Sequence, residues 1–179
     1  MKLRIVPFVL SAVATAVLLF GGWMLYKQFA VVSPFQKSIG QIEGVASAKE
    51  PTIDQDVVSV QVSLKPDANL KDVYESIAKE GKDAIGSREL KLDITNAAPD
   101  DQLEKVWSSV LFDVAEAMEK KNYSQIPNAL QKATASNKEI QFATELDDNN
   151  VYITLKDGNS TKYVVLPRTP AMLEVSTNA

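Results

Sequence analysis

Three acidic side chains in the segment 100–121 have a spacing that would suit acid–base chemistry. Asp113, Glu116 and Glu119 follow one another at intervals of three residues, and residues three or four apart lie side by side on a helix. Two neighbouring carboxylates can act as general acid and general base. A solvated acidic face opposite an apolar stripe gives the same pattern, and this is the interpretation that we favour.

A second group of oxygen-bearing side chains is the run Asp147, Asp148, Asn149 and Asn150. Carboxylate and amide oxygens are the ligands that calcium prefers, but the run lacks the alternating ligand spacing and the distal Glu of a calcium loop. Asp and Asn are also typical turn residues. We therefore predict an ordinary turn between two strands at this place and no metal site.

The chain contains no Cys and no His. This composition excludes disulfides, zinc sites with thiolate or imidazole ligands, Cys nucleophiles and Ser-His-Asp triads. A secreted eukaryotic domain of this size more often carries disulfides, so their absence favours a bacterial protein. The sequence thus predicts a protein that is not an enzyme and uses no cofactor.

Two aromatic residues, Trp107 and Tyr123, could face a ligand. Trp107 shares the spacing of a helical apolar stripe with Leu103, Val106 and Val110, and an aromatic residue on such a stripe more often belongs to the core. The sequence therefore predicts that Trp107 is a core residue.

The N-terminal segment Ile5–Tyr26 contains 22 consecutive positions without a charge. A helix of this length reaches about 33 Å, enough for a hydrocarbon core of about 30 Å. A cleaved signal peptide is the alternative, but its apolar region is usually about 7–15 residues long. We therefore predict a transmembrane helix over residues 5–26, which would make the lipid bilayer a partner, and a linker over residues 27–33.

The charges on either side of this segment predict its orientation. Lys2 and Arg4 precede it, so the positive-inside rule places residues 1–4 in the cytoplasm and the rest outside, in a single-pass protein of the cell membrane. Of the 19 Lys and Arg residues only Lys2, Arg4 and Lys27 precede residue 28, whereas all 23 Asp and Glu residues follow it. The exterior part is therefore acidic, which argues against nucleic acid as a partner.

The first half of the exterior part has an α-β-β-α-β order. Ser33-Pro34 is a typical helix start, and Gly44 is a typical helix end. Two strands that form a hairpin are predicted over residues 45–53, closed by Pro51, and over residues 57–64, the second with apolar residues at alternate positions. A capped amphipathic helix after Asn69 and a strand over residues 90–94 complete the unit.

The segment Ile42-Glu43-Gly44-Val45, placed between the helix and the first strand, resembles the ring-building motif of membrane-anchored secretion and sporulation rings. The resemblance covers residues 34–95. It implies domains that stack laterally at a membrane, with Ile42, Gly44 and Val45 as a possible interaction motif. A generic half-fold that uses Gly at the end of a helix gives the same order of elements.

The second half is predicted to consist of a long helix over residues 100–121, a short helix from Ser124 to Asn137 and three strands. Asp157-Gly158 is a strong turn pair for the last hairpin. The fold class is therefore α+β, with one domain over residues 34–170 and a loose tail over residues 171–179.

These features favour a non-enzymatic, membrane-tethered interaction domain that binds another protein of a bacterial cell envelope or a copy of itself. A tethered ligand-sensing or substrate-binding module is the first alternative, with a pocket between the α-β-β-α-β unit and the C-terminal strands. A hydrolase that uses carboxylates alone is the second, and it would need two acids facing each other across a cleft.

Overall fold

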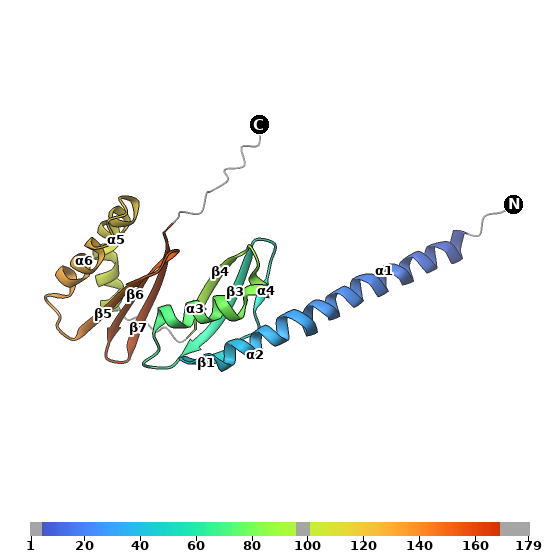
Figure 1. Ribbon diagram of the computed structural model, residues 1–179, viewed down its shortest axis with the longest axis horizontal. Coiled ribbons are helices and arrows are strands. Elements are labelled where there is room, and N and C mark those ends of the chain that lie inside the picture. The colour runs from blue at the N-terminus through green and yellow to red at the C-terminus, as the bar shows by residue number, and fades with distance from the viewer. Residues whose placement is uncertain (1–4, 96–100, 169–179) are drawn as a thin grey trace, which may run out of the picture. The chain divides into compact units, whose positions relative to one another are not determined.

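The structure is a computed structural model that describes residues 5–95 and 101–168, and the fold in these ranges is α+β (Figure 1). They contain six α-helices, one π-helical segment and two β-sheets. They divide into two compact units. The N-terminal unit extends to Pro66 and includes Glu75–Asp93, and the C-terminal unit comprises Asp67–Tyr74 and the residues from Ile94 onward.

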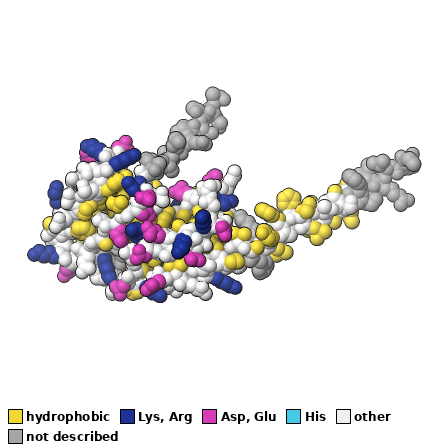
Figure 2. Space-filling model, in the orientation of Figure 1, with side chains coloured by type: hydrophobic (Ala, Val, Ile, Leu, Met, Phe, Trp, Pro, Cys, Tyr) yellow, Lys and Arg dark blue, Asp and Glu magenta, His cyan; other side chains and the backbone are white. Residues whose placement is uncertain are grey.

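Helix α1 (Ile5–Lys27) continues into the π-helical segment η1 (Gln28–Val32) and then into α2 (Ser33–Gln41). Large apolar side chains of α1 are exposed, Phe20 by 77% and Trp23 by 67%. They give this helix the apolar surface that is visible in Figure 2.

The structure corrects the prediction of a membrane segment. Among the described residues, no helix is long and apolar enough to cross a membrane. This finding contradicts the predicted transmembrane helix over residues 5–26, since a spanning helix needs about 20 consecutive apolar residues. It also contradicts the predicted single-pass membrane location. The segments 1–4 and 171–179, predicted as cytoplasmic N-terminus and loose tail, lie outside the described residues.

The sheet of the N-terminal unit is built around strand β3 (Val57–Leu64). Strands β1 (Val45–Ala48) and β2 (Thr52–Ile53) pair antiparallel with it, and β4 (Glu89–Ile94) also pairs with it. In β3 every second side chain is buried, as the alternation of its apolar residues predicts.

The single strand predicted over residues 45–53 is wrong in one respect, because β1 ends at Ala48 and β2 begins at Thr52. The interruption includes Pro51, which is buried and has no N–H group to donate to a strand ladder. Both short strands nevertheless pair with β3, so the predicted hairpin is confirmed.

Helices α3 (Leu70–Glu80) and α4 (Lys82–Ile85) follow β3. The predicted cap is present, since Oδ1 of Asn69 accepts a hydrogen bond from the backbone N–H of Asp72 at 3.1 Å. Gly81 separates the two helices, and a Cβ atom at this position would collide with the ring of Phe35. Gly81 therefore lets α2 approach closely.

The C-terminal unit joins two helices to a three-stranded antiparallel sheet. The helices are α5 (Asp101–Glu119) and α6 (Gln125–Thr134), and the strands β5 (Ile140–Leu146), β6 (Asn150–Asp157) and β7 (Ser160–Pro167) pair in sequence order. The predicted hairpin at Asp157-Gly158 is confirmed: Asp157 pairs with Ser160, and Gly158 has a φ of 53°.

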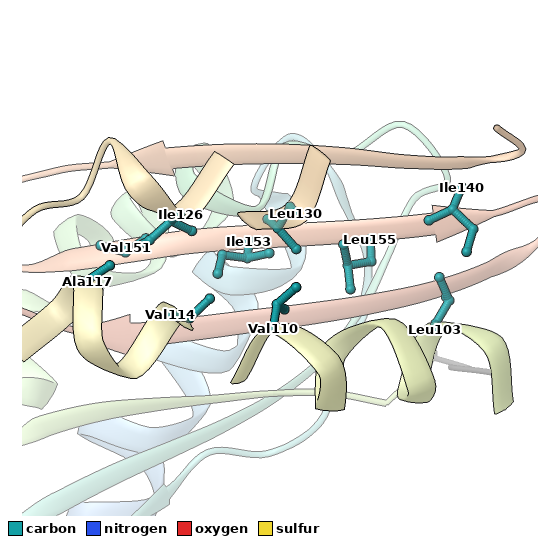
Figure 3. Close-up of a cluster of buried hydrophobic side chains, with 10 residues drawn as sticks. All are labelled: Leu103, Val110, Val114, Ala117, Ile126, Leu130, Ile140, Val151, Ile153 and Leu155. Carbon is teal, nitrogen blue, oxygen red and sulfur yellow. The ribbon is translucent and has the colours of Figure 1, made fainter. Parts of the chain in front are cut away.

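The two helices cover one face of this sheet, and their buried side chains meet those of β5 and β6 (Figure 3). The core of the C-terminal unit consists of Leu103, Val110, Val114, Ala117, Ile126, Leu130, Ile140, Val151, Ile153 and Leu155. All ten side chains are no more than 6% exposed. This core fixes the positions of α5 and β7, between which the groove described below lies.

Candidate functional site

An apolar groove lies between α5 and the end of β7, within the C-terminal unit. Its volume is about 290 Å³. Helix α5 contributes Trp107, Leu111, Val114, Ala115, Met118 and Glu119 to its walls, and the chain at the end of β7 contributes Leu166, Pro167 and Arg168. All but two of these side chains are apolar.

The groove exists because α5 carries more apolar surface than the sheet covers. Leu103, Val110, Val114 and Ala117 face the core, whereas Leu111 is 43% exposed. Trp107, Leu111, Ala115 and Met118 recur at helical spacing along the edge of the core stripe, where β7 covers only part of them.

Phe112, which follows Leu111 in the chain, does not line the groove and is 82% exposed on the side of α5 that faces away from the core. Leu111 and Phe112 are thus two large apolar side chains of α5 that the C-terminal unit leaves exposed.

Arg168 forms a positively charged rim of the groove and is held by three contacts. Its backbone N–H donates to the carbonyl oxygen of Asn149 at 2.7 Å, and its Nη1 donates to the carbonyl oxygen of Asp147 at 2.6 Å. Its guanidinium carbon lies 4.7 Å from the centre of the Tyr123 ring, which is a cation–π distance. Nε of Arg168 is buried without a hydrogen-bond partner in the described part of the chain.

Asp147 organises the turn between β5 and β6. Its Oδ1 accepts hydrogen bonds from the backbone N–H groups of Asn149 and Asn150 at 2.7 and 2.6 Å, and its Oδ2 accepts one from the hydroxyl of Tyr152 at 2.6 Å. Burial raises the pKa of Asp147, but the hydrogen bonds from Tyr152, Asn150 and Asn149 outweigh it, so the pKa is lower than usual. Burial raises the pKa of Tyr152 well above its usual range, and the hydrogen bond to Asp147 is the second cause of this increase.

The oxygen-rich run 147–150 therefore forms the predicted turn between two strands, and the oxygens of Asp147 are engaged within it. Nδ2 of the buried Asn150 donates to the hydroxyl of Tyr152 at 3.2 Å. Within the ranges 5–95 and 101–168, no group of three or more acidic residues is placed to hold a metal ion.

The three acidic residues of α5 are all exposed. Asp113 and Glu116 line a shallow depression of about 310 Å³ between α5 and α6, whereas Glu119 lies on the wall of the apolar groove. Glu116 forms an ion pair with Lys120, and the hydrogen bond from Lys120 lowers the pKa of Glu116. This arrangement is that of a solvated acidic face, as we expected from the sequence.

The residues of the possible ring-building motif have structural roles in the N-terminal unit. Ile42 ends α2, where its backbone N–H donates to the carbonyl oxygen of Ile39 at 3.1 Å. Gly44 has a φ of 90°, a conformation that favours glycine, and Val45 is buried and pairs with Leu64 in the sheet. These roles belong to the fold and leave the ring resemblance as a prediction.

The sequence did not predict the groove, although it drew attention to Trp107, which lines the groove, and to Tyr123, which contacts Arg168 at its rim. Trp107 is only partly buried, because it packs against the core and also lines the groove. Tyr123, the other aromatic residue considered, supports Arg168 at the rim. The signal in the sequence was the width of the apolar stripe, which includes Leu111, Ala115 and Met118 in addition to the positions that one sheet can cover.

Comparison of the chain with protein-family models, with curated proteins and with solved structures gives no match.

Proposed function

We propose that the chain is a non-enzymatic protein-interaction module whose C-terminal unit binds an apolar, helical segment of a protein partner. The groove between α5 and the end of β7, together with the exposed Leu111 and Phe112 of α5, is the observation that supports this proposal. Apolar grooves in proteins commonly accept the apolar face of an amphipathic helix.

The chemistry of the groove favours binding over catalysis. Its walls offer apolar side chains together with Arg168 and Glu119, and neither of these is paired with a nucleophile there. Burial of apolar surface is the dominant favourable contribution to most protein–protein association. The two charges of opposite sign would orient the partner, because charge complementarity contributes to the specificity of an interface.

The proposal can be tested by photo-crosslinking in cells of the source organism. A photoreactive amino acid at position 112 should form discrete adducts, because Phe112 is 82% exposed on α5, the helix that forms one wall of the groove. The mass of each adduct identifies the partner. The same amino acid at Gln131, which is exposed on α6 and does not line the groove, is the matched control.

A second substitution tests whether the adducts depend on the groove. Ala115→Lys places a charge on the groove wall at an exposed position, so it should remove the adducts and leave the circular dichroism spectrum unchanged. Gln131→Lys should leave the adducts in place. The proposal is wrong if position 112 gives no more adduct than position 131, or if Ala115→Lys has no effect on adducts in a folded protein.

A further inference from the structure

The outer face of α5 carries a pattern of charges that is symmetric about its most exposed apolar residue. Lys105 precedes Phe112 by seven residues, and Glu119 follows it by seven. Seven residues are about two helical turns, so the three side chains lie on the same side of the helix, about 10 Å apart along its axis. Lys105 and Glu119 are both exposed.

This pattern is complementary to itself in one orientation only. When two such helices run antiparallel with Phe112 at the two-fold axis, Lys105 of each faces Glu119 of the other. A parallel arrangement would place Lys105 against Lys105 and Glu119 against Glu119, which is destabilising. Two-fold symmetric contacts of the antiparallel kind are the commonest interfaces of homo-oligomers.

We propose that the partner of the C-terminal unit is a second copy of this chain, bound through an antiparallel α5–α5 contact that is centred on Phe112 and fixed by reciprocal Lys105–Glu119 ion pairs. This inference rests on the proposed function, since it names a second copy of the chain as the partner of the C-terminal unit.

A charge exchange tests the geometry in the full chain, kept in a non-ionic detergent that covers the exposed apolar side chains of α1. Sedimentation equilibrium gives the dissociation constant of the dimer. Lys105→Glu and Glu119→Lys should each weaken the dimer by about tenfold or more, because each replaces two attractive pairs by two repulsive ones. The double variant should return to within about threefold of the natural chain, because the exchanged charges again attract each other.

The matched control is Lys138→Glu, which makes the same change of charge at an exposed position outside α5 and should leave the dissociation constant unchanged. A monomeric natural chain would overturn the inference. A dimer whose stability the single exchanges do not alter would also overturn it.

A second measurement uses the lack of Cys in the natural chain. Phe112→Cys should form a disulfide-linked dimer under mild oxidation, because the two side chains meet at the axis. Asp113→Cys, one position around the helix, should not. If position 112 is not linked in this way while the charge exchange also has no effect, the antiparallel contact does not exist.

The photo-crosslinking experiment separates this inference from the proposed function. An adduct at position 112 with twice the mass of the 19.6 kDa chain supports both. An adduct of any other mass supports the proposed function and overturns the inference. The absence of an adduct at this position overturns both.

Discussion

Leu130 is the residue on which the packing of α6 against the sheet can best be tested. Its side chain has no exposed surface and lies in the core of the C-terminal unit together with Val114, Ile126 and Ile153 (Figure 3). The change Leu130→Ala keeps a good helix former at this position, so its effect on stability comes from the lost packing.

The expected cost follows from the buried volume that is removed. The change deletes about three carbon groups, which is about 2.4 kcal/mol at about 0.8 kcal/mol for each buried CH₂. The cavity left between α6 and the sheet adds to this, so we expect a loss of about 3–4 kcal/mol in the free energy of unfolding. With a urea slope of about 2 kcal/mol per molar, the midpoint should fall by about 1.5–2 M.

The assay uses the tryptophans of the chain as reporters. The chain has only two, Trp23 and Trp107, and Trp107 packs against the core of the C-terminal unit. In a Trp23→Phe background, the fluorescence of Trp107 during a urea titration therefore reports the unfolding of this unit alone.

Leu146→Ala is the matched control, because it makes the same change at the end of β5, where the side chain is 49% exposed. It should cost less than about 1 kcal/mol. Equal losses in Leu130→Ala and Leu146→Ala, or a loss below about 1 kcal/mol in the first, would refute the packing of α6 described above.

Two further substitutions test local features. The pKa of Asp147 is lower in the folded state than in the unfolded state, so the ionised carboxylate stabilises the fold. This stabilisation is fully present above the usual pKa of about 4 and is lost as the pH falls through the lower pKa of the folded state. Asp147→Asn should therefore cost about 1–2 kcal/mol at pH 7, because it weakens the partly exposed hydrogen bond from the Tyr152 hydroxyl. The melting temperature of this variant should decrease less below about pH 4 than that of the natural chain. An unchanged dependence of the melting temperature on pH would contradict this. Gly81→Ala should lower the stability by about 1–3 kcal/mol, measured by thermal melting, because the new methyl group meets the ring of Phe35. Gly40→Ala is the control, since nothing lies within 4 Å of the added methyl group and the change should cost no stability. Similar melting temperatures for the two variants would contradict the close approach of α2 to Gly81.

Much of the secondary structure could be predicted because it depends on local patterns. Three features depend only on residues that are close in the sequence: the alternation in β3, the cap at Asn69 and the turn at Gly158. The effect of Pro51 on the first strand is also local, since a residue without an N–H group weakens a strand at that point; the strand ends at Ala48, and a second short strand begins after Pro51.

The groove could not be predicted in the same way, because it depends on which flank of α5 the sheet covers. Trp107 and Leu111 have the same spacing and hydrophobicity as Val110 and Val114, yet only the latter two are fully buried. Their difference results from the position at which β7 ends beside the helix, which is a long-range property of the fold.

The order of pairing in the C-terminal unit has a consequence for the speed of folding. From α5 to β7, helix α5 packs against α6, and the sheet pairs β5 with β6 and β6 with β7, so partners are consecutive in the chain. The turn between Asp157 and Ser160 contains only Gly158 and Asn159, and the loop closed by such a contact loses little entropy. Proteins dominated by contacts between neighbouring segments fold faster than those with distant pairings. We therefore expect the three strands to pair and the two helices to cover them within milliseconds, so that the apolar face of the sheet is exposed only briefly during folding.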